Sequence, residues 1–295
     1  MSATGQERRV SPANAEAIEA WDGPLFDAFV RFRHSLVAGL ELHGNEAMRI
    51  HPPLPGERVL DIGCGFGDMS RQLAELVGPL GRVHGVDAAP RFIEIAKAET
   101  AEAGAATVSF EVADVELRKF DDTYDLAFSR MGTMFFANPV AALRNVRAAL
   151  RPGGRLVMIV WRSKLENEYF LRAQQIVERF VTKPEEYDEP TCGPGPFSMA
   201  NADTTSGILR SAGYADITLR RCDLPFRAGR DALDATEMVM TIGPAGEILR
   251  LAGDRAAHLH DAVRDALVEA MQEYTTDDGV QVPTSTWIVS ATNPA

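Results

Sequence analysis

The sequence predicts an α/β fold in which a doubly wound, mostly parallel sheet of seven strands carries helices on both faces. Short apolar runs of strand length alternate with longer stretches of helical periodicity over residues 58–161. Parallel strands need connections of a dozen or more residues, so this alternation favours a parallel sheet with helical crossovers. Hydrophobic residues make up 45% and charged residues 24% of the 295 residues, which is typical of a globular protein with a core of ordinary size.

The amino-terminal stretch 13–48 predicts one or two helices that precede the sheet. Apolar residues recur there at near-helical spacing: Ile18, Trp21, Leu25, Phe29, Phe32, Leu36 and Leu40. The segment His51-Pro52-Pro53-Leu54-Pro55-Gly56 then ends any helix, because proline lacks the amide donor and restricts the residue before it.

The central stretch contains five predicted strands and the helices that connect them. The strands are expected at 58–62, 82–87, 108–112, 124–128 and 155–161, and the helices at 69–77, 90–103 and 139–150. Right-handed crossovers between these strands would produce the doubly wound arrangement. The turn Arg151-Pro152-Gly153-Gly154 before the fifth strand is interpreted as conformational, because glycine permits positive φ.

The carboxyl-terminal stretch completes the sheet and adds helical insertions. Helices are expected at 167–179, at 203–212 before Gly213, and over 230–274 with a break at Gly243-Pro244. Strands are expected at 216–226 and 280–291, and the turn-rich segment 183–198 is interpreted as a surface loop or lid. We therefore predict one integrated domain with a helical cap (1–55), a central core (56–165) and a remainder that forms the substrate region (166–295).

Composition narrows the class of partner and the location. A formal net charge of −12 disfavours nucleic acid, whose phosphates it would repel. No apolar run approaches the roughly 18 residues of a membrane span, and no apolar stretch follows Arg8 and Arg9 as a signal peptide requires. We expect a soluble, cytoplasmic protein without a membrane partner. Cys64, Cys192 and Cys222 are widely spaced and are interpreted as reduced thiols, and no metal site is predicted.

The first strand ends in a glycine-rich turn, Asp61-Ile62-Gly63-Cys64-Gly65-Phe66-Gly67, directly before a helix. Small residues let a ligand approach the backbone, and the free amides of the helix start favour an anionic group. By itself the pattern is also compatible with a tight turn that binds nothing. Asp87, about 20 residues on, ends the second strand at the spacing where a carboxylate binds ribose hydroxyls in nucleoside-cofactor folds. The glycines recur at every second residue, which fits the pyrophosphate loop of a nicotinamide enzyme poorly.

Five segments in order resemble the successive motifs of class I, Rossmann-like methyltransferases that depend on S-adenosylmethionine. They are VLDIGCGFG, HGVD, FEVADVE, FDDTYDLAFSR and LRPGGRLVMIVW, between Arg58 and Trp161. Within that family, the chain most resembles the small-molecule group that includes the ubiquinone/menaquinone biosynthesis enzymes. The resemblance implies S-adenosylmethionine as cofactor, S-adenosylhomocysteine as product and a small-molecule methyl acceptor.

The resemblance also implies a cofactor role for ten residues. Asp61 would organise the turn and approach the methionine amine through water, and Gly63 and Gly65 would run along the methionine part. Asp87 would accept from both ribose hydroxyls, and Ala88 would touch the adenine face. Asp114 would accept from the adenine amine beside the Val115 amide. The segment after the fourth strand would bind the methionine amine through a backbone carbonyl and line the path to the sulfonium: Ser129, Arg130 and Met131.

Three acidic or basic residues have structural alternatives at this point. Asp114 could cap a turn, Asp125 is interpreted as structural, and Arg130 fits a surface salt bridge as well as a site near the methionine carboxylate or substrate. Trp21 and Phe26, placed on the first helix, could close over the cofactor as this region does in the family.

The catalytic residues are left unknown, because transfer from a sulfonium mainly requires alignment in a dry pocket. A general base is needed only for a neutral hydroxyl or carbon acid. The sequence offers six side chains without selecting one: His34, His43, Glu168, Tyr169, Tyr187 and His258. Another group could be pocket lining or core: Met131, Met134, Phe135, Phe136, Trp161, Phe197, Met199, Met238 and Met240.

Several functional alternatives stay open. Ser129-Arg130-Met131-Gly132 stands where some family members carry an N-P-P-Y-type tetrapeptide, so methylation of nucleobase or glutamine amino groups is disfavoured. Oxygen, carbon, nitrogen and sulfur acceptors remain. The chain could instead bind the cofactor without transferring its methyl group, as a structural or regulatory partner, or be a nicotinamide-dependent dehydrogenase. A homodimer through the carboxyl-terminal helices is conceivable but rests on no motif.

Overall fold

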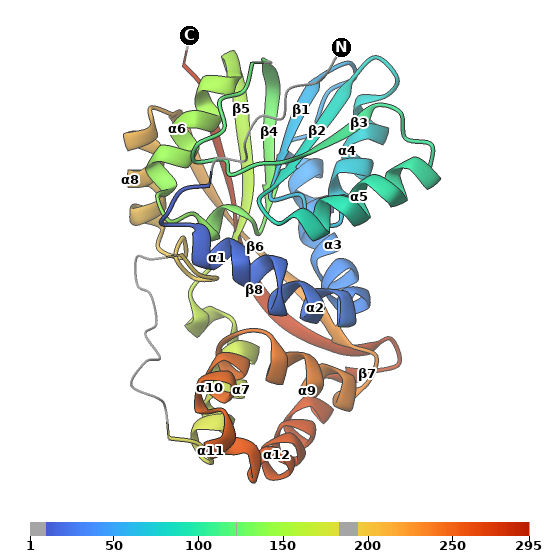
Figure 1. The fold of residues 1–295 in the computed structure, drawn as a ribbon, viewed down its shortest axis with the longest axis vertical. Coiled ribbons are helices and arrows are strands. Elements are labelled where there is room, and N and C mark those ends of the chain that lie inside the picture. Colours follow the sequence, from blue (N-terminus) through green and yellow to red (C-terminus); the bar gives the residue numbers. More distant parts are fainter. Residues whose placement is uncertain (1–9, 122, 183–193, 295) are drawn as a thin grey trace.

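The computed structural model describes residues 10–121, 123–182 and 194–294 and contains one central sheet (Figure 1). The strand order across this sheet is β3-β2-β1-β4-β5-β8-β6, with a short β7 paired to β8. The strands are β1 (Arg58–Ile62), β2 (Arg82–Asp87), β3 (Val108–Val112), β4 (Tyr124–Arg130), β5 (Leu150–Trp161), β6 (Ala215–Gly229), β7 (Thr275–Thr276) and β8 (Gly279–Thr292). The seven predicted strands are confirmed, and the two-residue β7 is the addition.

The sheet is mostly parallel, as predicted. The pairs β2·β3, β1·β2, β1·β4 and β4·β5 are parallel, whereas β8 runs antiparallel to both β5 and β6. The strand order reverses at β1, since the chain proceeds from β1 outward to β2 and β3 and then returns to β4 on the other side. Open α/β sheets bind ligands at the carboxyl ends of the strands at such a reversal.

Helices cover both faces of the sheet. The crossover helices are α4 (Asp68–Val77), α5 (Pro90–Glu102), α6 (Pro139–Ala149) and α8 (Ala202–Ala212). The crossovers through α4 and α5 lead away from β1 in one direction, and the crossover through α6 leads from β4 in the other. Right-handed connections that run in opposite directions place their helices on opposite faces of a sheet. Helix α8 ends where predicted, at Gly213, whose φ of 93° suits glycine.

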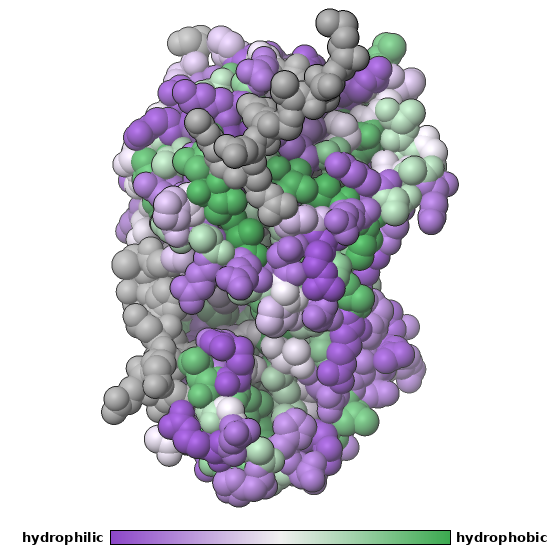
Figure 2. Space-filling view, viewed as in Figure 1, coloured by the Kyte–Doolittle hydropathy of each residue, from purple (hydrophilic) through white to green (hydrophobic). Residues whose placement is uncertain are grey.

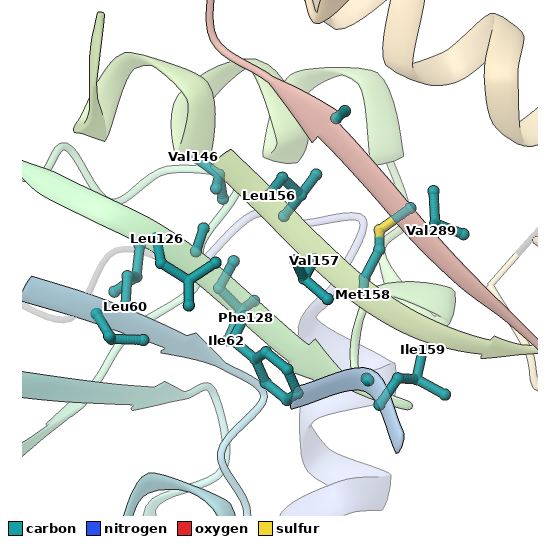
Figure 3. Close-up of a cluster of buried hydrophobic side chains, with 14 of the residues drawn as sticks. Leu60, Ile62, Leu126, Phe128, Val146, Leu156, Val157, Met158, Ile159 and Val289 are labelled. Atoms are coloured by element: carbon teal, nitrogen blue, oxygen red, sulfur yellow. The ribbon is translucent and has the colours of Figure 1, made fainter. Parts of the chain in front are cut away.

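The core lies between these helices and the central strands. Figure 3 shows Leu60 and Ile62 of β1, Leu126 and Phe128 of β4, and Val146 of α6 directed into one cluster. All five side chains are at most 1% exposed. Strands of a parallel sheet are buried on both faces, which explains why these segments are continuous apolar runs rather than alternating ones.

Two strand boundaries differ from the prediction, one at the carboxyl end of β4 and one at the amino end of β5. Strand β4 continues through Ser129 and Arg130, so that Met131 is the first residue after it. Strand β5 begins at Leu150, before the predicted turn, and its pairing with β4 shifts register between Tyr124 and Leu126. Gly153 has a φ of 74° within this irregularity, which agrees with a conformational role for the turn.

From residue 10 on, where the structure is described, three helices precede the sheet, whereas one or two were predicted. They are α1 (Ala15–Asp22), α2 (Pro24–Arg31) and α3 (Arg33–Ile50). Gly23 separates the first two with a non-helical φ of −119° and ψ of −113°, and Pro24 begins α2 because it needs no amide partner there. Phe26 therefore lies on α2 and not on the first helix.

A helical unit lies beyond the carboxyl end of β5 (Figure 1). It consists of α7 (Glu168–Glu178), α9 (Ala232–Thr241), α10 (Pro244–Ala252), α11 (Asp254–Ala257) and α12 (His260–Gln272). Trp161, the last residue of β5, pairs with Thr286, whereas the β6·β8 pairing continues as far as Gly229 and Val280. These extended strand ends carry a second hydrophobic cluster, to which Phe226 and Val282 belong. Helix α3 joins the two parts, because Leu40 packs against both clusters.

No helix in the described part of the chain is long and apolar enough to cross a membrane. The predicted loop or lid at 183–198 falls largely on residues 183–193, which lie outside the described residues.

Candidate functional site

The glycine-rich turn joins β1 to α4 at the point where the strand order reverses. Gly63, Gly65 and Gly67 all have positive φ, at 67°, 52° and 73°. The Gly63 and Cys64 amides donate to the Val86 carbonyl at 2.8 and 3.1 Å, so the turn is fixed against the end of β2. This backbone conformation is one that L side chains rarely adopt, which explains the glycine at every second position.

The turn also packs closely against the chain that leaves β4. A Cβ atom on Gly63 would lie 3.0 Å from the Cα of Gly132, and one on Gly132 would lie 2.9 Å from the Ile62 carbonyl oxygen. Ser129, which is fully buried, donates from its hydroxyl to the same Ile62 carbonyl at 2.8 Å. The loops after β1 and β4 therefore form one continuous surface at the carboxyl edge of the sheet.

Asp87 ends β2 beside this turn. Its carboxylate accepts from the Gly65 amide at 3.0 Å through Oδ2 and from the Ala89 amide at 3.0 Å through Oδ1. Each oxygen retains lone-pair capacity for a further donor. Burial raises the pKa of Asp87, and the hydrogen bonds from Ala89 and Gly65 oppose that shift. Ala88 follows directly and is half-buried. The geometry thus brings Asp87 and the glycine turn together, as the sequence predicted.

Asp61 lies beneath the turn and is 1% exposed. The Ser70 hydroxyl of α4 donates to its Oδ2 at 2.5 Å. Burial raises the pKa of Asp61 to about 7, although the hydrogen bond from Ser70 and the positive charge of Arg130 lower it. This carboxyl group is therefore poised between its neutral and charged forms near neutral pH.

Arg130 ends β4 and points toward the start of α4. Its Nη2 donates to Asp68 Oδ2 at 2.5 Å, and the two side chains are 10% and 15% exposed, so the surface salt bridge considered above is a largely buried one. Its Nη1 is buried and has no hydrogen-bond partner among the described residues. A buried guanidinium nitrogen without an acceptor is costly, which makes this atom a candidate partner for an anionic ligand group.

Met131 follows Arg130 with a φ of 61°, one of two such non-glycine residues in the described part of the chain. Its amide donates to the Ile159 carbonyl at 3.0 Å, which holds the strained backbone in place. Strain of this kind concentrates at ligand sites, where the surrounding structure enforces it.

Asp114 lies after β3 and is engaged by the amino-terminal segment. Its carboxylate accepts from the Ser11 amide at 2.9 Å, from Asn14 Nδ2 at 3.2 and 3.1 Å, and from the Glu116 amide at 2.9 Å. The turn-capping alternative is thus realised by the bond from Glu116. The side chain of Val115 is buried in the main core, and its carbonyl accepts from Asn145 Nδ2 at 2.8 Å. Sequence reasoning did not identify Asn14 or Ser11, since nothing local to them signals a partner a hundred residues away.

An aromatic cluster lies against the turn and joins it to the amino-terminal helices. Phe26, Phe66 and Phe92 are buried in it, with Trp21 and Phe29 packed against them. Trp21 also meets Phe135 edge-on at 5.0 Å between ring centroids. Figure 2 shows apolar residues gathered above α1 in this view, in front of β4 and β5. Trp21 and Phe26 thus belong to the same cluster as Phe66 of the turn.

The six candidate bases differ in their exposure and in their hydrogen-bond partners. His43 is fully buried, with Nε2 3.0 Å from Thr284 Oγ1 and its ring 6.0 Å from that of Trp161. His34 is exposed and bonded to Asp234 at 2.7 Å. Glu168 and His258 are exposed, and Tyr187 lies outside the described residues. Tyr169 is 1% exposed, its hydroxyl has no partner among the described residues, and burial raises its pKa.

The predicted pocket residues divide between the two hydrophobic clusters. Met131, Met134, Trp161 and Met199 are buried in the main core, with Phe135, Phe136 and Phe197 packed against it. Met238 and Met240 belong to the second cluster. Phe170, which sequence reasoning missed, packs against both clusters and meets Trp161 at 5.4 Å and Phe197 at 5.7 Å between ring centroids.

Three other expectations concern the cysteines, Asp125 and metal binding. Cys64 and Cys222 are free and buried, whereas Cys192 lies outside the described residues. Asp125 accepts from the Arg58 amide and from Arg151 Nε, which agrees with its structural interpretation. Within residues 10–121, 123–182 and 194–294, no group of histidine, cysteine and acidic side chains could hold a metal ion.

The chain is similar in sequence to known proteins. A family model described as a methyltransferase domain matches residues 54–207, which is more than half of the chain. The aklanonic acid methyltransferase of Streptomyces sp. (strain C5) is 40% identical over 114 residues, which cover 38% of this chain and 52% of the relative. The ubiquinone/menaquinone biosynthesis C-methyltransferase of Ectopseudomonas mendocina (strain ymp) is 36% identical over 107 residues, covering 36% and 42%. The match thus spans about half the length of these relatives.

The fold is also similar to that of solved structures. The YcgJ protein from Bacillus subtilis superposes with a TM-score of 0.55 over 87% of this chain and 98% of its own, at 15% identity. That similarity supports the arrangement of the sheet and its helices.

Proposed function

The chain belongs to the family of methyltransferase domains, and we propose that it transfers the methyl group of S-adenosylmethionine to a small-molecule acceptor. The observation that carries the proposal is the joint geometry of Asp87, the glycine turn and Arg130 at the reversal of strand order. It combines an acceptor for ribose hydroxyls, a backbone surface without Cβ atoms and a buried cation. S-adenosylhomocysteine would be released as the product.

The residues at the site fit the parts of S-adenosylmethionine. Asp87 has lone pairs for two ribose hydroxyls, and Ala88 would contact adenine. Gly63 and Gly65 leave room for the methionine part, and Asp61 would meet the positive amine through water. The unpartnered Nη1 of Arg130 would hold the methionine carboxylate, while the backbone from Ser129 to Met131 would receive the amine. Asp114 and the Val115 amide would bind the adenine edge.

When bound, the cofactor supplies an electrophilic methyl group on a sulfonium. The protein then has to orient the acceptor in line with that group and exclude water. Trp21, Phe26 and Phe135 would keep water from the sulfonium. The clustered rings of Trp161, Phe170 and Phe197 would orient an apolar acceptor, and acceptor oxygen, carbon, nitrogen and sulfur atoms remain alternatives.

Four further features of the protein belong to this proposal. They are the division into a cap (1–55), a core (56–165) and a substrate region (166–295), a cytoplasmic location, the exclusion of nucleic acid, and homodimerisation through the carboxyl-terminal helices. Size-exclusion chromatography with light scattering measures the last of these directly.

Titration calorimetry with S-adenosylmethionine and with NAD tests the proposal. We expect S-adenosylmethionine to bind and NAD not to bind, and the reverse result would refute the cofactor. Asp87→Ala should weaken binding by roughly 1.5 to 3 kcal/mol, the scale for losing hydrogen bonds to a charged group. Asp87→Asn should lose less, since one carbonyl oxygen is retained. An unchanged dissociation constant would contradict the ribose assignment.

Turnover is measured separately, by following S-adenosylhomocysteine production with a panel of acceptors. Production that depends on an added acceptor supports the enzyme. Tight cofactor binding without production by any member of the panel would favour the alternative of a structural or regulatory cofactor-binding protein.

A further inference from the structure

The amino-terminal segment contacts the carboxylate that the proposed function assigns to adenine. Asn14 and Asp114 are 6% and 5% exposed, so this contact is buried. The Asn14 amide nitrogen lies 3.2 Å from Asp114 Oδ1 and 3.1 Å from Oδ2, and its amide oxygen accepts from the Ala137 amide at 3.3 Å. Asn14 therefore bridges the segments that follow β3 and β4.

The contacts leave Asp114 without spare capacity. A carboxylate has two oxygens with about four lone-pair sites between them. Oδ1 accepts from Asn14 and from the Glu116 amide, and Oδ2 accepts from Asn14 and from the Ser11 amide at 2.9 Å. An adenine amine that is to bind Asp114 must replace one of these donors.

Asn14 is the donor whose chemistry matches adenine. A carboxamide presents an NH2 donor next to an oxygen acceptor. The edge of adenine likewise presents its exocyclic amine next to a ring nitrogen that accepts. In the structure, the Asn14 amide nitrogen donates to the Asp114 carboxylate, and its amide oxygen accepts from the Ala137 backbone amide. The edge of adenine requires the same two kinds of partner, an acceptor for its amine and a donor for its ring nitrogen.

The segment is anchored at its other end, so release of Asn14 would not detach it. The Arg91 amide at the start of α5 donates to Asp22 Oδ1 at 2.9 Å, and Arg91 Nη1 donates to the Asp22 carbonyl at 3.2 Å. Gly23 follows with its non-helical backbone. Helix α1 is thus held at its carboxyl end by the contacts of Asp22 with Arg91, and at its amino end by the hydrogen bonds of Asn14 to Asp114.

We propose that the side-chain amide of Asn14 donates to Asp114 at the place where the adenine amine would donate. Cofactor binding then displaces residues 11–14, while α1 stays bound at Asp22. Asn14 is then a positioning residue that sets cofactor affinity without touching the reacting atoms. The inference rests on the proposed adenine role of Asp114.

The variant Asn14→Ala tests the competition by calorimetry with S-adenosylhomocysteine. Affinity should rise roughly three- to tenfold, because the adenine amine no longer replaces a protein hydrogen bond of ordinary net strength. Asn138→Ala is the matched control, since Asn138 caps α6 at the same edge and does not bond Asp114. Its affinity should equal that of the wild type.

A ligand control separates competition from a general loosening of the segment. S-ribosylhomocysteine keeps the homocysteine and ribose parts but lacks adenine, so it places no group at Asp114. Asn14→Ala should therefore leave its affinity unchanged. An equal gain for both ligands would overturn the proposal, as would weaker binding of S-adenosylhomocysteine to the variant.

Hydrogen exchange on the wild-type protein gives a readout that needs no variant. Saturation with S-adenosylhomocysteine should speed exchange at residues 11–14 at least severalfold and leave residues 18–22 protected. Slower exchange at 11–14 would overturn the proposal. Wild-type protein that binds no S-adenosylhomocysteine would overturn the proposed function and this inference together, whereas binding with the opposite variant effects would overturn the inference alone.

Discussion

The hydrogen bonds and ionisation of single residues at the candidate site depend more on burial than on the neighbouring residues in sequence. Asp61 is the penultimate residue of β1 and Asp87 the last residue of β2, and both carboxylates lie close to the glycine turn, yet only Asp61 is nearly inaccessible. Asp87 is held by two backbone amides, whereas Asp61 accepts from the Ser70 hydroxyl. Aspartate therefore has two roles here: Asp87 is the proposed acceptor for the ribose hydroxyls, and Asp61 is a buried carboxyl group that titrates beneath the turn.

The raised pKa of Asp61 predicts that cofactor binding releases protons. Its ordinary value of 3.8 rises to about 7 in the folded protein, so this group's contribution to stability falls as the pH rises between those values. A positive methionine amine nearby would favour the carboxylate. At pH 7 we expect release of up to about half a proton per cofactor bound.

Calorimetry in two buffers with different ionisation enthalpies measures this release. The variant Asp61→Asn should bind with the same heat in both buffers. Equal heats for the wild-type protein would show that Asp61 does not change its ionisation.

Among the elements, the loops after β1 and β4 depend on each other. Gly63 and Gly132 approach so closely that neither tolerates a side chain without moving backbone. The strained Met131 and the buried Ser129 hydroxyl belong to the same junction. A substitution that moves the backbone of one loop should therefore also move the backbone of the other.

Gly63→Ala should weaken cofactor binding as well as folding. Its Cβ would meet the Gly132 backbone at 3.0 Å, in addition to the cost of a side chain at positive φ, which is roughly 1 to 2 kcal/mol. Gly56→Ala is the matched control, because Gly56 has a φ of 84° with open space around it.

We expect Gly56→Ala to lose roughly 1 to 2 kcal/mol of unfolding free energy and to bind S-adenosylhomocysteine normally. Gly63→Ala should lose more, and its dissociation constant should rise at least about tenfold, a change of 1.4 kcal/mol. Urea unfolding and calorimetry measure the two quantities. Equal behaviour of both variants would contradict the close packing of the two loops.

At the scale of the whole molecule, helix α3 connects the beginning of the chain to its end. His43 of α3 contacts Thr284 of β8, whose hydroxyl donates to the Leu224 carbonyl of β6 at 2.8 Å. Burial lowers the pKa of His43 from 6.5 to about 4, and the charge of Arg130 acts in the same direction, whereas the Gly39 carbonyl opposes it. The folded protein thus keeps this ring neutral.

The stability contributed by a neutral His43 should be lost in acid. The unfolded chain takes up the proton below pH 6.5, whereas the folded chain does so only near pH 4. Between pH 7 and pH 5 the free energy of unfolding should fall by roughly 2 kcal/mol more in the wild type than in His43→Gln. Urea unfolding at both pH values measures the difference. A parallel fall in both proteins would show that His43 is protonated in the folded state.

The fold and the conformation of the glycine turn followed from the sequence because both depend on local patterns. Apolar runs of strand length, separated by helical stretches, predicted the seven-stranded sheet and its mostly parallel order. Glycines at 63, 65 and 67 and the acid at 87 indicated the turn, because positive φ and a strand-end carboxylate depend on residues near each other in sequence. The apolar periodicity of 13–48 did not separate the three helices found in the described part of this stretch, because the break depends on the Gly23-Pro24 pair and not on that periodicity.

Only the tertiary structure decided how distant residues combine. Asn14 meets Asp114 and His43 meets Thr284 across 100 and 241 residues, and no local pattern encodes such a meeting. The buried pairing of Arg130 with Asp68 and the position of Phe170 between two cores depend equally on packing. The sequence by itself determined the sheet and its glycine turn, because local periodicity and backbone conformation specify them. The tertiary structure decided which side chains surround that turn and how deeply each is buried, because both result from long-range packing.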